Sequence, residues 1–120
     1  AGVSKSMDVK ADFSYERRYP SVINSLDETQ AAINAAKLAA GDDKVMTNFP
    51  PVMGSEDFAY IAQLRPAAMF RLGIRNEERG IVNGLHNNHF DLDEDVLPMG
   101  VSIFVQAVRE FLADAESFTS

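Results

Sequence analysis

The stretch AAMFRLGI, residues 67–74, decides the predicted fold. It predicts a buried β-strand, because apolar side chains at alternate positions line one face and Met69 lies on the other. The residues of the first face are Ala68, Phe70, Leu72 and Ile74. Helical patterns precede and follow this stretch, and an alternation of strands and helices favours a layered arrangement. We therefore predict an α/β fold.

A helix is predicted upstream of this strand, over residues 26–40. Ser25 and Glu28 have the capping-box spacing, in which each side chain accepts a hydrogen bond from a free backbone N–H of the first helical turn. The alanine-rich interior favours a helix, and Gly41 offers a left-handed stop at its end. Residues 44–46 then predict a short strand.

Two more helices are predicted on either side of residues 67–74. The first follows Ser55, an expected cap, and is expected to end at Arg65, which precedes a proline. The second follows the acidic residues 93–95 and is strongly amphipathic. Its apolar positions are Leu97, Val101, Phe104, Val105, Val108, Phe111 and Leu112.

Residues 8–19 predict a further strand near the N-terminus. Apolar and polar side chains alternate there, with Val9, Phe13 and Tyr15 on the apolar face. A single strand is unstable, and no second run of comparable length follows within hairpin distance. We therefore expect its sheet partners to lie outside this sequence, which does not begin with Met.

The composition excludes several classes of function. Lys and Arg total 11 against 18 Asp and Glu, a net charge of −7, so a general nucleic-acid binder or a ligand of anionic membranes is not expected. The chain has no cysteine, which excludes disulfides and thiolate metal sites within it. No apolar stretch is expected to reach the roughly 20 residues that span a bilayer, and no signal peptide is recognised, so a cytoplasmic location is the default expectation.

Both histidines lie in a polar loop over residues 76–91. His86 follows the predicted buried strand and is therefore well placed to reach a site at the sheet edge, as a metal ligand or an acid–base group. From its spacing alone, with no other ligand nearby in the sequence, a solvated loop histidine is the favoured interpretation. His89 is a weaker candidate, because a spacing of three suits a shared metal on a helix and the local Asn-rich sequence is not helical.

The remaining polar clusters have structural explanations. Residues 91–95 lack the glycine and the spaced acidic positions of a calcium loop, so a helix start accounts for them better. Donors at Arg17, Arg18, Tyr19 and Asn24 could bind a carboxylate or simply end a strand. The sequence contains no glycine-rich phosphate loop, nucleophile-elbow serine or cysteine nucleophile, which disfavours nucleotide hydrolysis and serine or thiol catalysis.

Three segments resemble one family in order and approximate spacing: YPSVIN at 19–24, MGSEDFA at 53–59, and LH at 85–86 with FDLDE at 90–94. They are similar to the amidohydrolases related to hippurate hydrolase, N-acyl-amino-acid deacylases and plant auxin-conjugate hydrolases, a branch of the zinc aminopeptidase-like peptidases. The resemblance covers most of this chain but only the last third or so of a family member. It implies that residues 1–19 end an inserted α+β lid or dimerisation domain and that 20–120 form the C-terminal part of the α/β catalytic domain.

The resemblance also implies site residues. Family members bind two divalent metals, zinc or manganese with cobalt or nickel as further options, and His86 matches the last histidine ligand. Gly54 and Ser55 match a substrate-pocket segment, and Asn24 matches a lid-hinge asparagine near that pocket. The catalytic glutamate of the family lies upstream of this sequence, so no catalytic residue is expected here. One departure is Asn87-Asn88, where family members often have Ser-Pro.

The function implied is hydrolysis of the amide bond of N-acyl amino acids by a homodimeric, metal-dependent enzyme of which this chain is a part that is inactive alone. Two alternatives remain open at this point. One is a binding or interaction module of the same ancestry without the chemistry. The other is a carboxypeptidase or dipeptidase of the same superfamily.

Overall fold

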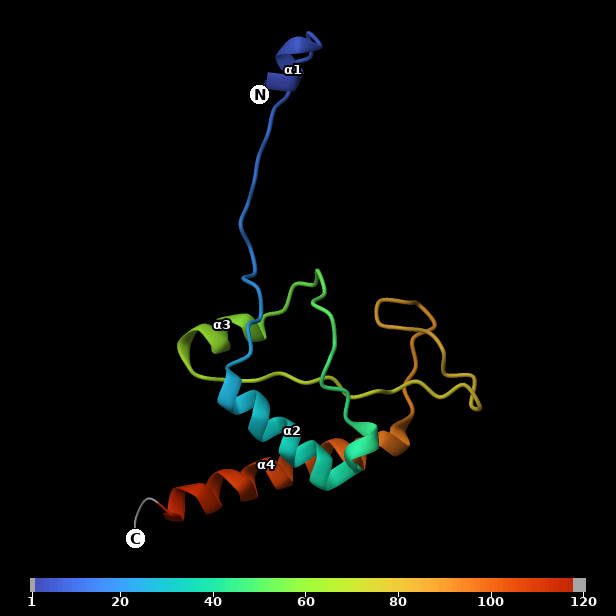
Figure 1. Ribbon diagram of the computed structural model, residues 1–120. Helices are drawn as coiled ribbons and strands as arrows, with labels where there is room; N and C mark the ends of the chain where they lie inside the picture. The colour runs from blue at the N-terminus through green and yellow to red at the C-terminus, as the bar shows by residue number, and fades with distance from the viewer. Residues whose placement is uncertain (1, 118–120) are drawn as a thin grey trace.

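The computed structural model describes residues 2–117 in backbone and 2–113 in side chains. Figure 1 shows the α-helices joined by extended segments. The helices are α1 (Gly2–Ser6), α2 (Leu26–Ala40), α3 (Phe58–Leu64) and α4 (Leu97–Ser117), and the short 3₁₀ helices are η1 (Asp42–Lys44) and η2 (Glu94–Val96).

The core lies where α4 packs against α2 and against the extended residues 67–74. Ala35 of α2 is fully buried and Ile103 of α4 retains 5% of its exposure. The ring of Phe104 lies 5.4 Å from that of Phe70. A methyl group added at Gly100 would lie 3.2 Å from Leu72 Cδ2, so the glycine permits this close approach.

The predicted helices are confirmed, with local differences at their starts. The helix predicted at 26–40 has those bounds, and Gly41, at φ 93°, ends it in the region that favours glycine. The capping box does not form, because the Ser25 hydroxyl accepts a hydrogen bond from Ala67 N (3.0 Å). The helix after Ser55 begins only at Phe58, whose amide donates weakly to Glu56 (3.4 Å).

The predicted strands are not present in the part of the chain that the structure describes. Residues 8–19 and 67–74 are assigned no regular structure, and residue 44 belongs to η1. An isolated bridge between Asn76 and Ile81 is the strand-like pairing found among the described residues. A strand needs a hydrogen-bonded neighbour, and the alternating pattern does not supply one. The α/β class expected from the sequence is therefore not confirmed, and the described chain is partly helical.

Asn24 and Ser25 form hydrogen bonds with the backbone of residues 67–69, which has no neighbouring strand in the described chain. Asn24 donates from Nδ2 to Met69 O (2.9 Å) and accepts at Oδ1 from Met69 N (3.0 Å). Ser25 N donates to Ala67 O (2.9 Å), beside the bond from Ala67 N to the Ser25 hydroxyl. These four bonds fix the start of the extended segment against the start of α2.

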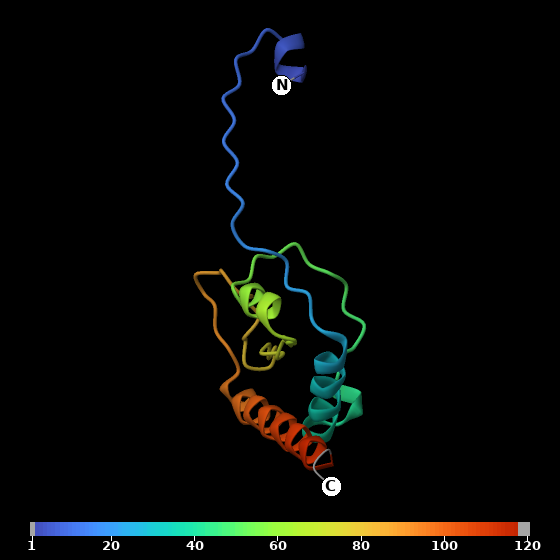
Figure 2. The ribbon, with the colours of Figure 1, turned by 90° about the vertical axis from the view of Figure 1, so that its left-hand side faces the viewer.

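The N-terminal segment runs away from the rest of the molecule (Figures 1 and 2). Phe13 is 87% exposed, so the face predicted to be buried meets solvent. The radius of gyration is 20.6 Å, against about 14 Å for a compact domain of this length. The alternating segment thus has the extended conformation of a strand without sheet partners.

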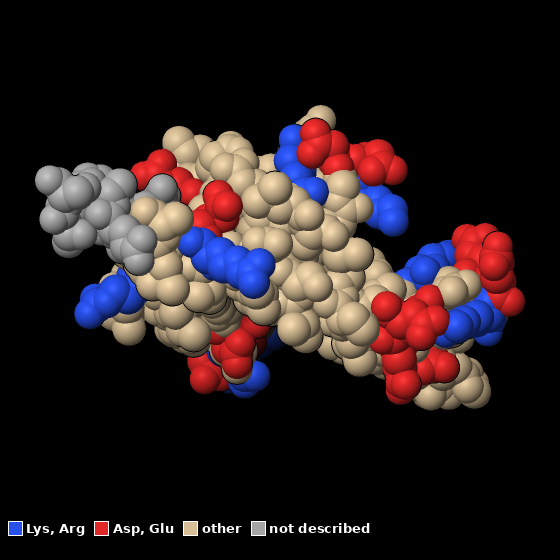
Figure 3. Space-filling model, turned by 90° about the horizontal axis from the view of Figure 1, so that it is seen from below, with Lys and Arg blue, Asp and Glu red and all other residues tan. Residues whose placement is uncertain are grey.

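Helix α4 also exposes apolar side chains, among them Val101, Phe104 and Phe111. Seen from below, the molecule has a broad uncharged surface between separate groups of charged residues (Figure 3). The prediction that no apolar stretch reaches membrane-spanning length is wrong, because Glu94–Ala113 is long and apolar enough by length and composition. A core helix of a soluble protein meets the same criteria when it is mostly buried, whereas only 6% of this window is buried although α4 packs against α2.

Candidate functional site

The polar loop containing both histidines begins with a tight turn. Asn76 N donates to Ile81 O (2.9 Å) and Ile81 N donates to Asn76 O (2.8 Å). Within the turn, Asn76 Oδ1 accepts from Arg79 N (3.2 Å), and Gly80 has φ of 74°, which favours glycine. This turn sets the position at which the following segment, residues 82–92, leaves the body of the molecule.

Asp93 fixes the other end of that segment. Its amide donates to Ile74 O (3.1 Å), and its carboxylate accepts from Asn76 Nδ2 (2.6 Å), Arg79 Nη1 (2.8 Å) and Asp95 N (3.3 Å). Arg79 Nη2 also bonds Asp95 Oδ2 (2.5 Å). Asp93 is 7% exposed and is the one buried polar residue among the side chains that the structure describes.

The pKa of Asp93 is held below its ordinary value. The hydrogen bond from Asn76 is the largest cause, and the Asp95 amide and the Arg79 guanidinium lower the pKa further. Burial acts in the opposite direction, because it disfavours the charged carboxylate. The carboxylate is therefore held ionised by its partners at the start of η2.

His86 lies in a turn closed by a hydrogen bond from Asn87 N to Gly84 O (3.3 Å). Its backbone has φ of 67°, in the left-handed region that side chains other than glycine enter at a cost. The residue is exposed, and no hydrogen bond occupies its imidazole in the described part of the chain. Strained backbone of this kind clusters at functional sites, which favours the functional interpretation of this histidine.

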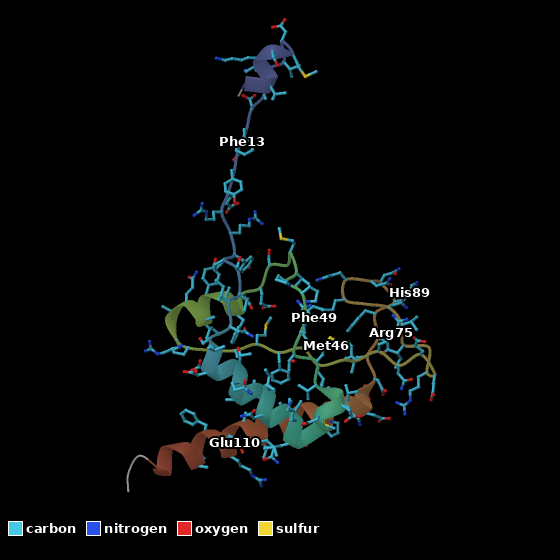
Figure 4. All side chains as sticks on the ribbon, in the orientation of Figure 1. Phe13, Met46, Phe49, Arg75, His89 and Glu110 are labelled. Atoms are coloured by element: carbon cyan, nitrogen blue, oxygen red, sulfur yellow. The ribbon has the colours of Figure 1, made fainter. Side chains whose placement is uncertain are left out.

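His89 is held through its backbone. Its amide donates to Asn87 Oδ1 (2.8 Å), and its carbonyl accepts from Asn83 Nδ2 (3.2 Å). Figure 4 shows His89 and Arg75 on the same side of the molecule, far from Phe13 on the N-terminal segment. The asparagines of this loop thus shape its backbone around the two histidines.

An open groove of about 690 Å³ lies beside this loop. It is lined by residues 69–75 and 82–85, together with Glu56 and Asp91. Gly54, Ser55 and Asn24 are not among its lining residues. Gly54 and Ser55 lie exposed in the extended approach to α3, with open space around Gly54 Cα.

The described residues do not form a metal site by themselves. No group of three or more His, Asp or Glu side chains lies together in the described part of the chain. Zinc sites in proteins take three or four protein ligands, so His86 supplies at most one of them. The histidine predicted as a ligand is thus exposed, and among the described residues it belongs to no group of three or more such side chains.

The Asp93 network was missed as a functional feature by sequence reasoning, which explained residues 93–95 as a helix start. That explanation is correct in part, since Asp93 accepts from Asp95 N at the start of η2. The sequence signal for the contacts of Asp93 with Asn76 and Arg79 was weak. It consists of an Asn that opens a turn ending at Gly80, with an arginine inside the turn. The long separation of Asn76 and Arg79 from Asp93 hides their pairing from local patterns.

Comparison with known proteins identifies related sequences. The sequence model of the peptidase family M20/M25/M40 matches residues 3–110. The chain is 37% identical over 99 residues to the IAA-amino acid hydrolase ILR1-like 6 of Arabidopsis thaliana, covering 82% of this chain and 21% of that protein. It is 34% identical over 113 residues to an uncharacterized hydrolase of Staphylococcus haemolyticus, covering 91% and 28%.

A third similarity is to the thermostable carboxypeptidase 1 of Saccharolobus solfataricus, at 35% identity over 82 residues, covering 68% of this chain and 20% of that protein. No solved structure matched the chain. The chain therefore spans between about a fifth and somewhat more than a quarter of the length of these relatives.

Proposed function

The chain belongs to the peptidase family M20/M25/M40, and on that premise we propose that it is the C-terminal part of a metal-dependent amidohydrolase that acts on N-acyl amino acids. The family confirms the resemblance carried by the three segments at 19–24, 53–59 and 85–94. It supports a hydrolase, and the relative named an IAA-amino acid hydrolase favours the substrate class proposed.

The observation that carries the proposal is the placement of His86. Its imidazole is exposed and unbonded in the described structure, its backbone is held at φ 67°, and its loop is tied down at both ends. Neutral imidazole is the commonest protein ligand of transition metals. We assign His86 as one ligand of a two-metal site, with zinc or manganese as the metals and the other ligands supplied from outside residues 2–113.

The substrate-binding assignments differ in the support they receive. Gly54 and Ser55 are exposed just before α3, where a small residue leaves room for a bound carboxylate. Both polar atoms of the Asn24 amide bond the backbone of Met69, so we assign Asn24 an anchoring part near the pocket. A homodimer and a cytoplasmic location complete the proposal.

A carboxypeptidase is the second candidate, favoured by the similarity to the Saccharolobus solfataricus carboxypeptidase. The decisive experiment offers the complete protein, with added Zn²⁺ or Mn²⁺, a matched panel of N-acetyl and N-benzoyl amino acids, free dipeptides and N-blocked peptides. We expect hydrolysis of the N-acyl amino acids that is abolished by a chelator and restored by metal.

The other outcomes of this panel separate the alternatives. A preference for free dipeptides or for release of C-terminal residues from longer peptides would replace the amidohydrolase by a dipeptidase or a carboxypeptidase. If no compound is hydrolysed with or without added metal, but the same compounds bind, the protein is a binding module without hydrolase activity.

A further inference from the structure

The two ends of the segment that carries His86, residues 82–92, meet at one point of the molecule. Its entry follows Ile81, which is bonded twice to Asn76. Its exit is Asp93, whose amide bonds Ile74 O and whose carboxylate bonds Asn76 Nδ2 (2.6 Å). Asn76 therefore contacts both ends, and residues 82–92 form a loop closed at its base, as in compact Ω-loops that are often functional.

Asp93 makes the strongest bonds at this base. It is buried, and it accepts a charge-assisted hydrogen bond from Arg79 (2.8 Å) in addition to the bond from Asn76. Arg79 bridges onward to Asp95 in η2, which connects the base to the start of α4. Bonds to charged groups are about twice as strong as neutral ones, so removal of the Asp93 charge should loosen the base more than any other single change.

The bonds inside the loop are few and exposed. They join Asn87 N to Gly84 O, Asn83 to the carbonyl of His89, Asn87 to the amides of His89 and Phe90, and Leu92 N to the Asp91 carboxylate. The left-handed conformation of His86 costs energy in a residue with a side chain and persists where the surroundings over-determine it. The bond from Asn87 N to Gly84 O fixes this conformation locally, and the closed base holds the two ends of the loop that contains the turn.

We propose that Asp93 is a positioning residue for His86: by joining both ends of loop 82–92 it holds His86 in the backbone conformation in which the imidazole projects free of the protein. The claim that Asp93 holds loop 82–92 rests on the contacts of Asp93 described above. The consequence for metal binding rests on the proposed function, in which His86 is a ligand. Mutation of a residue that orients a metal ligand typically changes the metal affinity by about 10- to 100-fold.

The test compares three variants of the complete protein. Asp93→Asn keeps the shape of the side chain and can still accept from Asn76, but it removes the charge that pairs with Arg79. Arg79→Gln removes the same ion pair by changing its arginine. It tests the proposal if Asp93→Asn does not fold. Glu77→Gln is the matched control, because it breaks the exposed Arg75–Glu77 pair (3.1 Å) in the same turn without touching Asp93.

Two measurements are made on each variant. Hydrogen–deuterium exchange of the metal-free protein reports opening of residues 82–92 independently of any metal. Titration with Co²⁺, followed by its visible absorption, reports both affinity and the ligand geometry. We expect Asp93→Asn to raise exchange in the loop about tenfold or more, to weaken Co²⁺ binding by about 10- to 100-fold and to alter the spectrum, with Arg79→Gln smaller and Glu77→Gln unchanged.

Unchanged loop exchange in both Asp93→Asn and Arg79→Gln would overturn the proposal. Increased exchange with unaltered Co²⁺ affinity and spectrum would overturn the link between the loop base and the metal. If the parent protein binds no Co²⁺, the proposed function fails, and exchange alone decides whether Asp93 holds the loop.

Discussion

Ile103 provides the clearest measure of the packing of α4, because it is the buried residue among the described side chains of that helix. It retains 5% exposure on α4, so Ile103→Ala removes three carbon groups from a packed site. At about 0.8 kcal/mol each, the transfer part of the loss is about 2.4 kcal/mol, and the residual cavity adds to it. The better helix propensity of alanine returns a few tenths, which leaves an expected loss of about 2–3 kcal/mol.

The assay is urea unfolding of the 120-residue chain, followed by the helical signal in circular dichroism and extrapolated to water. Ile23→Ala is the matched control, because the same substitution at a side chain that is 77% exposed should cost about 0.6 kcal/mol. Equal losses for the two variants, a loss below about 1 kcal/mol at Ile103, or a parent chain without a cooperative helical transition would refute the reasoning.

Three further predictions concern the loop base and the Asn24 contact. The hydrogen bond from Asn76 holds the pKa of Asp93 below its ordinary value in the folded chain, so the unfolded chain takes up a proton first as the pH falls. The unfolding free energies of the parent and Asp93→Asn should therefore converge with falling pH, and a difference that stays constant from neutral to strongly acidic pH would contradict this. Gly80→Ala, at φ 74°, should destabilise the chain by about 1–2 kcal/mol in urea unfolding, whereas Gly84→Ala should be near neutral, and equal effects would count against the turn. Asn24→Asp loses the donor to Met69 O and should lower the unfolding free energy by about 1 kcal/mol, with exposed Asn48→Asp as an inert control; no difference between them would remove the anchoring part.

Local patterns predicted α2, α3 and α4, but not the short helix α1. Apolar spacing, with glycine, proline and acidic residues near the helix ends, predicted three features. These are the helix at 26–40, the end of α3 before Arg65 and the start of α4 at Leu97. These signals act within a few residues of one another. They therefore remain valid whatever the rest of the molecule does.

Features that depend on distant partners were not predictable in the same way. The alternation in residues 8–19 and 67–74 predicts strands, but pairing requires a neighbour that the described chain does not offer. Ser25 illustrates the same limit, because its hydroxyl bonds Ala67 N and not its own helix. The division into residues 1–19 and 20–120 stays a prediction.

The candidate site divides in the same manner. The sequence placed His86 in a polar loop after residues 67–74, and the structure confirms that placement and adds its left-handed backbone. The network of Asn76, Arg79 and Asp93 joins residues more than a dozen positions apart, so no local motif announces it. No group of three or more side chains that could hold a metal ion was found among the described residues, so the metal site remains a proposal.

The most direct test of the central claim is the metal content of the complete protein with His86→Ala, beside His89→Ala as the matched control from the same loop. The account predicts that His86→Ala loses bound zinc or manganese and the chelator-sensitive hydrolysis of N-acyl amino acids, whereas His89→Ala retains both. Equal metal content and equal hydrolysis in His86→Ala and the parent protein would contradict the assignment of His86 as a ligand.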